Sequence, residues 1–380
     1  MLMMFCTAPL LVVAAAESQN WLGLQVDYAD RGYAFTPWPA VELRNVTVRS
    51  EPSIQAHRAW VTPDWGEWLT TFRTSRVKVH VDQITAQASG LKRLGRIDGK
   101  SSYKVSTLRF DKLKLMLGEG SIELPAGQMD FAADGTLSHI SIALGEKVTL
   151  EASPAGDHMN ILVRTAQLKW DALPAFLFDN VAAQGTLDDQ QLLLDRIGAT
   201  SDGGAVSGAV RLTIKDQYVL DADLKLTALR AKAFLARMYP HATLQGDLSG
   251  QVKIRGTGAS FADIGKALSV SGTYSVKSGA IDRLGLLEGM RKVSAGPAGG
   301  GLTRFDSLDG SFNAVADKPA TVTIRRLDAG ALQASGGFVL NENRELRGNL
   351  SGSMRLPGGE TSSRSFVLRG RVDSPSLEIQ

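Results

Sequence analysis

The stretch ATLQGDLSGQVKIRGTGAS, from Ala242 to Ser260, decides the fold class of this chain. Polar residues alternate in it with an apolar or glycine set consisting of Leu244, Gly246, Leu248, Gly250, Val252, Ile254 and Gly256. Strict alternation over this length predicts a β-strand with one buried face and one face in water. A strand that feeds a dinucleotide-binding loop is covered on both faces and is apolar throughout. This stretch therefore indicates an antiparallel sheet with one solvated face.

The end of the same stretch, Gly256-Thr-Gly-Ala-Ser260, has the glycine spacing of a phosphate-binding loop. Such a loop needs a buried strand before it, a helix directly after it and a third glycine. The strand is one-sided and the third glycine is missing. We interpret the segment as a turn that leads into a short helix, with Ser260 as the N-cap.

The alternation recurs in stretches along the chain, at 41–48, 77–82, 105–117, 208–227, 322–324, 332–340, 346–356 and 366–372. Its period slips once within 105–117, as at a β-bulge. Short helices are expected only at 171–178, 229–239, 261–268 and 282–293. We count about 18 to 20 strands, and an open sheet beyond about ten strands must curl, split or close. The predicted fold is mainly β: an elongated, curled antiparallel sheet that forms an apolar groove, with a few short helices.

Composition excludes several classes of protein. The chain has 380 residues, and 42 Lys and Arg against 39 Asp and Glu give a net charge of +3. No basic run is long enough to follow a phosphate backbone, so no nucleic acid partner is expected. The one cysteine, Cys6, lies in the apolar N-terminal stretch. The folded part therefore has no disulfide and no thiolate metal site.

The first 16 residues carry no charge and contain apolar runs such as Leu10-Leu-Val-Val-Ala-Ala-Ala16. We interpret them as an export signal or membrane anchor. They are shorter than the roughly 20 residues of a spanning helix, and Ala14-Ala-Ala16 also suits a cleavage site. An uncleaved membrane anchor and a cleaved leader both stay open. We divide the remainder into an N-terminal β-rich region, 17–240, and a C-terminal β region, 241–380.

Residues for catalysis or metal binding are not apparent. The five histidines, His57, His80, His139, His158 and His241, lack a second ligand at metal spacing. Asp221 and Asp223 share a strand face and are more typical of a solvated surface than of a calcium site. No nucleophile elbow or cofactor motif occurs. We expect no enzyme activity, no metal and no cofactor.

A cluster of tryptophans near the N-terminus, Trp60, Trp65 and Trp68, surrounds Thr62-Pro63-Asp64. Tryptophan is frequent both in packed cores and at membrane interfaces. Packing in the first layer of the sheet and a position at a membrane interface both stay open for this cluster.

Several stretches together resemble the C-terminal region of AsmA-like proteins, the AsmA/TamB-type envelope proteins. The stretches are Gly246–Ser260, Gly272–Ile281, Leu302–Phe312, Leu332–Phe338 and Phe366–Pro375, and Pro39–Val48 is similar to the opening strand of that family. The resemblance is strongest from Gly246 onward. It implies a protein of the bacterial inner membrane with a β-rich groove in the periplasm. It also implies a role in outer-membrane biogenesis and in phospholipid movement between the two membranes.

From the alternation we predict the residues that line the apolar floor of the groove and contact phospholipid acyl chains: Val210, Leu212, Ile214, Leu220, Leu224, Leu226, Leu244, Leu248, Val252 and Ile254. The first functional hypothesis is a non-enzymatic lipid-handling protein driven by burial of apolar surface. The alternative is a structural or assembly factor for outer-membrane components, with a closed β core and envelope protein partners. For an enzyme the sequence names no residues.

Overall fold

The computed structural model describes residues 26–34, 39–49, 52–67, 76–94, 104–118, 120–144, 148–169, 177–237, 239, 243–292, 296–298 and 300–380. The hydrophobic segment 1–16, His241 and Trp68 lie outside the described residues. The predicted fold class is confirmed: the described chain is mainly β, with 24 strands hydrogen-bonded as one curled sheet and a few short helices.

The chain divides into two compact units. The first comprises Met1–Thr165, Ala182–Leu194 and Thr213–Asp216, and the second comprises Ala166–Val181, Asp195–Leu212 and Gln217–Gln380. This division follows the density of contacts, and the boundary suggested by the sequence at residue 240 stays a prediction.

The first unit contains β1 (Val26–Asp27), β2 (Asp30–Ala34), β3 (Ala40–Val48), β4 (Ile54–Pro63), β5 (Arg76–Gln87), α3 (Ala88–Lys92), β6 (Lys104–Leu117), β7 (Gly120–Leu124), β8 (Gly127–Phe131), β9 (Leu137–Ala143) and β10 (Val148–Ala155). Four strands have residues in both units: β11 (His158–Lys169), β12 (Leu177–Leu187), β13 (Gln191–Ser201) and β14 (Gly204–Ile214).

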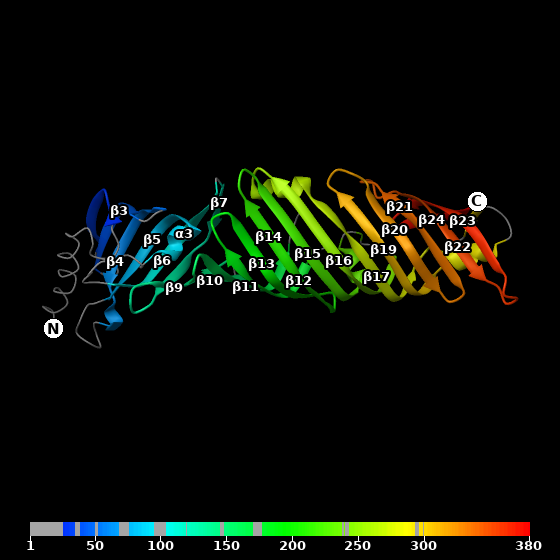
Figure 1. Cartoon of the computed structure of the whole chain (residues 1–380), viewed down its shortest axis with the longest axis horizontal. Helices are drawn as coiled ribbons and strands as arrows, with labels where there is room; N and C mark the ends of the chain where they lie inside the picture. Colours follow the sequence, from blue (N-terminus) through cyan, green and yellow to red (C-terminus); the bar gives the residue numbers. More distant parts are fainter. Residues whose placement is uncertain are drawn as a thin grey trace. The chain divides into compact units, whose positions relative to one another are not determined.

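The second unit contains β15 (Tyr218–Arg230), α4 (Ala231–Ala236), β16 (Leu244–Gly258), the 3₁₀ helix η1 (Phe261–Ala267), β17 (Ser269–Ile281), α5 (Leu286–Arg291), β18 (Gly296–Ala298), β19 (Thr303–Val315), β20 (Ala320–Ala329), β21 (Leu332–Leu340), β22 (Leu346–Arg355), β23 (Thr361–Arg371) and β24 (Ser374–Ile379). Figure 1 shows many of these strands side by side.

In the first unit, one strand pair departs from the antiparallel pattern. β5 and β6 run parallel, with Val79 beside Leu108 and Ala86 beside Leu115. A parallel pair needs a long crossover, and the chain between these strands carries α3, which the sequence did not reveal. Leu91 of α3 is buried. The crossover therefore also contributes to the apolar core of this unit.

The alternation of buried side chains slips by one residue along a line that crosses β3 to β6. Successive inward side chains are three residues apart in each strand: Leu43 and Val46, Ala56 and Ala59, Val81 and Ile84, Phe110 and Leu113. The last pair is the slip predicted within 105–117, which is confirmed. Such irregularities bend a sheet while keeping apolar residues on one face.

In the second unit, β15 to β17 and β19 to β24 form an antiparallel ladder in sequence order. The connection from β17 to β19 carries α5 and β18. β18 pairs with β24, with Gly296 opposite Ile379 and Ala298 opposite Leu377. A long connection thus reaches β24 and covers part of its free edge, which limits unwanted strand pairing.

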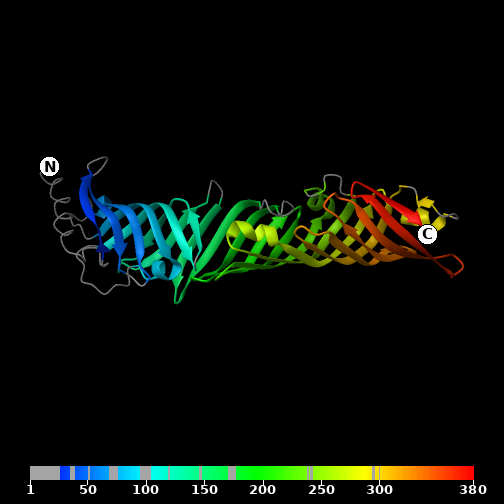
Figure 2. The ribbon, with the colours of Figure 1, turned by 90° about the horizontal axis from the view of Figure 1, so that it is seen from above.

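A second line of slips crosses the second unit. Inward side chains three residues apart occur at Leu226 and Leu229, at Phe305 and Leu308, and at Ile324 and Leu327. Figure 2, turned by 90°, shows the ribbons of β19 to β24 crossing in projection, as expected of a curled sheet. We call the face with the buried side chains the inner face.

The predicted helices form in part. The helix expected at 229–239 is the shorter α4, and the one expected at 282–293 is the shorter α5. The segment 261–268 forms a 3₁₀ helix, with the Ser260 hydroxyl accepting the N–H of Asp263 at 3.3 Å. The helix expected at 171–178 is wrong at its end, because Leu177 and Phe178 belong to β12, and 171–176 lie outside the described residues.

Glycines on the inner face of the second unit leave no room for a side chain. A Cβ on Gly310 would lie 2.1 Å from the carbonyl oxygen of Thr323 and 2.4 Å from the hydroxyl oxygen of Tyr274. Gly310→Ala should therefore destabilise the protein by about 1 to 3 kcal/mol, the usual cost of overpacking. Urea unfolding of the purified protein measures this difference.

Gly198→Ala is the matched control, because it lies on a strand, on an exposed position, and nothing stands within 4 Å of its Cβ position. The control should keep or slightly raise the unfolding free energy. Equal destabilisation by both changes would show that steric crowding at Gly310 is not the cause.

Candidate functional site

Eight of the ten residues predicted for the groove floor are buried. Their exposed fractions lie between 0% and 8%, for Leu212, Ile214, Leu220, Leu224, Leu226, Leu248, Val252 and Ile254. Val210 and Leu244 are half-buried. Ile214 belongs to the first unit and the other nine to the second. Alternation thus separated buried from solvent-facing positions, while the predicted contact of these residues with lipid stays a prediction.

These side chains are packed against one another and against the short helices. In cross-strand register, Leu220 lies opposite Gly256 and Leu224 opposite Val252. η1 contacts β15 and β16, and α4 also contacts both strands. In the described part of the chain, the inner side chains of β15 and β16 therefore form a packed core with η1 and α4.

The inner face becomes partly accessible farther along the sheet. A group of half-buried apolar side chains, which we call the open strip, consists of Val270, Phe312, Ala314, Val322, Ile324, Phe338 and Leu340. These residues belong to β17, β19, β20 and β21. On the same strands, toward the opposite ends, the inner side chains of Leu308, Leu327 and Leu332 are 0% to 4% exposed.

Cross-strand register makes the open strip continuous. Phe312 lies opposite Val322, and Val322 lies opposite Phe338 on the next strand. Gly272 and Gly348 continue this row at its two ends. Side chains directly opposite each other in antiparallel strands are in contact range. The open strip is therefore one apolar surface across neighbouring strands.

Glycines occupy positions next to this row, so no side chains project from the sheet there. Gly310 lies opposite Ile324, and Ile324 lies opposite Gly336. A Cβ at Gly336 would come within 2.2 Å of the carbonyl oxygen of Asn349. The side chain of Tyr274 extends over Gly310 instead, where its hydroxyl donates to the carbonyl oxygen of Thr323 at 3.2 Å. Burial raises the pKa of Tyr274 to about 12, so the phenol stays neutral at physiological pH.

The residues of the open strip were not among those predicted from the sequence for the groove floor. The alternation that found Leu332–Leu340 as a strand already placed Phe338 and Leu340 on one face with Leu332. Nothing in that pattern separates a covered position from an open one. The open strip is distinguished by a tertiary feature: in the described part of the chain, the main contacts of η1 and α4 are with β15 and β16, and those of α5 are with β18 and β22 to β24.

α5 covers the inner face beyond the open strip. It contacts β22, β23 and β24, with Leu286 and Met290 buried. The sulfur of Met290 lies 3.0 Å from the position that a Cβ on Gly352 would take. The buried hydroxyl of Thr303 donates to the carbonyl oxygen of Leu284 and accepts the N–H of Leu286, which fixes the start of α5.

The turn predicted at Gly256–Ser260 is wrong for its first three residues: Gly256–Gly258 continue β16 and pair with Leu220, Val219 and Tyr218, and only Ala259 and Ser260 bend toward η1. A Cβ on Gly256 would lie 2.6 Å from Cγ2 of Ile264, and one on Gly258 would lie 2.7 Å from the backbone nitrogen of Ile264. Both glycines are thus needed because η1 folds back onto the end of β16. A side chain of the protein itself fills the space above the first glycine.

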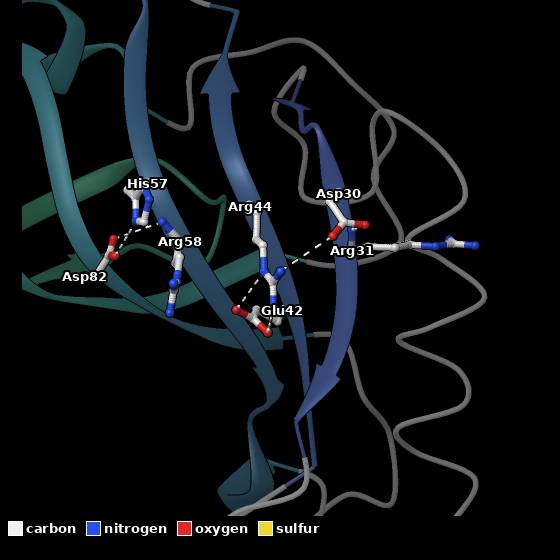
Figure 3. Close-up of polar contacts among 7 residues, drawn as sticks. All are labelled: Asp30, Arg31, Glu42, Arg44, His57, Arg58 and Asp82. Carbon is white, nitrogen blue, oxygen red and sulfur yellow. Dashed lines mark hydrogen bonds and ion pairs between the residues drawn. The ribbon is translucent and has the colours of Figure 1, made fainter.

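Polar groups gather on the solvent-facing side of the first unit. Figure 3 shows Arg44 beside Glu42 and Asp30, and His57 beside Asp82. Among the described residues, no group of three His, Cys, Asp or Glu side chains has the arrangement of a metal site. His80 lies 3.4 Å from Asp111, and its ring also contacts that of Trp60 with a centroid separation of 5.5 Å.

Trp60 alternates with the buried Ala59 and Val61, so its side chain lies on the solvent-facing side. Packing in the core is therefore wrong for Trp60. Position at a membrane interface stays a prediction.

Asp82 has a structural role at the line of slips that crosses β3 to β6. Its carboxylate accepts the backbone N–H of Arg58 at 2.9 Å and that of Gln83 at 2.6 Å, and His57 Nδ1 lies 2.9 Å away. The strand register is interrupted at these residues. Burial alone would raise the pKa of Asp82, but the hydrogen bonds outweigh it and the pKa is lowered.

Asp82→Asn should reduce the unfolding free energy by about 1 kcal/mol at neutral pH, because the carboxylate accepts several hydrogen bonds. The folded pKa lies below the unfolded value of about 3.9, so this stability is present above that pH and is lost as the pH falls through the folded pKa. The difference between wild type and variant in urea unfolding should shrink below about pH 4. Asp111→Asn, at an exposed carboxylate, is the control. A difference that stays constant down to pH 2 would contradict this assignment.

The remaining acidic candidates are neutralised locally. Asp221 forms an ion pair with Arg255 at 3.1 Å, and Asp223 lies opposite Lys253 in the register of β15 and β16.

No helix in the described part of the chain has the length and hydrophobicity to span a membrane. No protein-family model, no curated protein and no solved structure matches this chain.

Proposed function

We propose that the chain is a non-enzymatic lipid-handling protein that binds phospholipid acyl chains on the open strip. One observation carries the proposal: half-buried apolar side chains form a continuous surface across β19, β20 and β21 in cross-strand register. A contiguous apolar surface that water reaches is typical of a binding site. Removing it from water supplies about 25 cal/mol per Å2.

The resemblance to AsmA-like proteins gives this binding a setting. A chain of that type would handle or conduct phospholipid between the inner and outer membranes in outer-membrane biogenesis. It would be held at the inner membrane facing the periplasm, or act in the periplasm after removal of its leader. No catalytic residue and no cofactor is needed for such a role.

The alternative is a structural or assembly factor with a closed core. One observation favours it: eight of the ten residues expected to line the floor are at most 8% exposed. A face packed in this way has no space for a lipid on the inner side of β15 and β16. The two candidate functions thus differ in whether the open strip takes up lipid.

A photo-crosslinking amino acid at Phe338 or Val322 tests the proposal. The purified protein is mixed with vesicles of phosphatidylethanolamine and phosphatidylglycerol, irradiated and analysed by mass spectrometry. We expect lipid adducts at both positions. The controls are the adjacent residues Val339 and Thr323, which are exposed on the opposite face. Equal labelling at all four positions, or labelling at none, would refute binding on the open strip.

A further inference from the structure

The solvent-facing side of the second unit has a broad depression over β20 to β23. Its volume is about 1050 Å3, and it is lined by Arg325, Arg326, Gln333, Ala334, Ser335, Ser351, Gly352, Ser353, Ser362, Ser363, Arg364, Ser365 and Gln380. Three of these side chains are cationic and none is an aspartate or glutamate. The depression is therefore chemically unlike the apolar open strip.

The slip between Ile324 and Leu327, in the second unit, explains why two adjacent arginines both face water. In a regular strand, successive side chains point to opposite faces. Arg325 and Arg326 lie between the successive inward side chains of Ile324 and Leu327, and both arginines are exposed. The register shift between Ile324 and Leu327 places the pair opposite Ser335. Irregularities of this kind often redirect a side chain at a functional position.

The two arginines differ in their charge partners. Arg326 forms an ion pair with Asp328 at 2.7 Å. Within the described part of the chain Arg325 makes no ion pair and no side-chain hydrogen bond, and its charge acts on the phenol of Tyr274. Arg364 lies opposite Gly352, whose Cβ direction points at α5, so its side chain starts on the inner face. Arg325 is therefore the cation best placed for an anion in the depression.

Serine hydroxyls provide the rest of the polar surface. Ser335 lies opposite Ser351, and Ser351 lies opposite Ser365 on the next strand. Ser353 lies opposite Ser363 in the neighbouring row. Each hydroxyl can donate to an anionic oxygen. The short side chains leave space beside the long arginines.

We propose that this depression binds a phosphate group, with Arg325 as the main charged contact and the serine hydroxyls as additional donors. The planar guanidinium suits two oxygens of a phosphate, and such charge-assisted hydrogen bonds are about twice as strong as neutral ones. The site lies on the face opposite the open strip, so it does not rest on the proposed function. The phosphate belongs to a small soluble ester or to a lipid headgroup.

Calorimetry with glycerol 3-phosphate and inorganic phosphate tests the soluble source, and co-sedimentation with phosphatidylglycerol vesicles tests the lipid source. Arg325→Gln should weaken binding about tenfold, as expected for loss of one charged contact to phosphate. Arg325→Lys keeps the charge and should recover part of the affinity. Arg347→Gln is the control, because Arg347 is exposed on β22 and does not line the depression.

The two arms identify the source of the phosphate. Binding that depends on Arg325 in calorimetry indicates a soluble ester, and binding that depends on it only with vesicles indicates a headgroup. Unfolding curves of each variant show whether the fold is kept. Equal affinity of wild type and Arg325→Gln in both arms, or no binding in either, overturns the proposal. Failure of lipid crosslinking on the open strip would leave this result unchanged.

Discussion

Leu248→Asp is expected to unfold the second unit. Leu248 is 8% exposed and lies opposite Leu229 and Val276 in the strands on its two sides. A carboxylate at this position would be buried without a partner, which costs several kcal/mol. Single domains have a total stability of about 5 to 15 kcal/mol. We expect loss of protease resistance and of the cooperative unfolding transition, measured by limited proteolysis and circular dichroism.

Gln251→Asp is the control for this variant, because Gln251 is exposed on the same strand and lies opposite Lys225. It should fold like the wild type. If Leu248→Asp also stays folded, water reaches the inner face at β16. That result would make the predicted floor accessible, and it would favour a groove that extends into this region.

Phe338→Asp is expected to abolish most lipid binding while the protein stays folded. Phe338 is half-buried, so a carboxylate there can remain hydrated when no lipid is present. The variant loses the burial of one large apolar side chain, which contributes about 1.5 to 3 kcal/mol, and adds a charge that acyl chains avoid. The expected decrease in affinity is at least tenfold. Binding of a fluorescent fatty acid and thermal unfolding measure the two effects separately.

Val339→Asp is the matched control. It is the next residue on β21, it is 41% exposed, and alternation directs it to the opposite face. The same charge at this position should leave fatty acid binding unchanged. If both variants bind like the wild type, the open strip is not the lipid site, and the structural or assembly role becomes the better explanation.

Where apolar and polar residues alternate clearly, the sequence alone determined both the strand and its faces. Leu220, Leu224, Val252 and Ile254 were assigned to the buried face from alternation, and all are at most 8% exposed. This works because the direction of a side chain along a strand depends on local backbone geometry. The short helix capped by Ser260 was also predictable, but the bend before it comes after Gly258, because Gly256–Gly258 stay paired with β15.

The two lines of slips, one in each unit, were visible in the sequence only in part. A spacing of three between inward apolar residues marks each slip, as at Phe110 and Leu113, where the sequence predicted it. The same spacing at Ile324 and Leu327 was not interpreted. Whether such slips align into one bend depends on the register of neighbouring strands. Register is a property of pairs of strands, so one strand's pattern does not contain it.

Only the tertiary structure decided which part of the inner face is covered. Leu248 and Phe338 have equivalent positions in their alternating patterns, yet Leu248 is buried and Phe338 is partly open. The cover comes from segments that fold back over the sheet, η1 onto β16 and α5 onto β22 to β24. Local alternation determines the face to which a side chain points. Its access to water depends on contacts with residues distant in sequence, because burial is set by everything that packs above it.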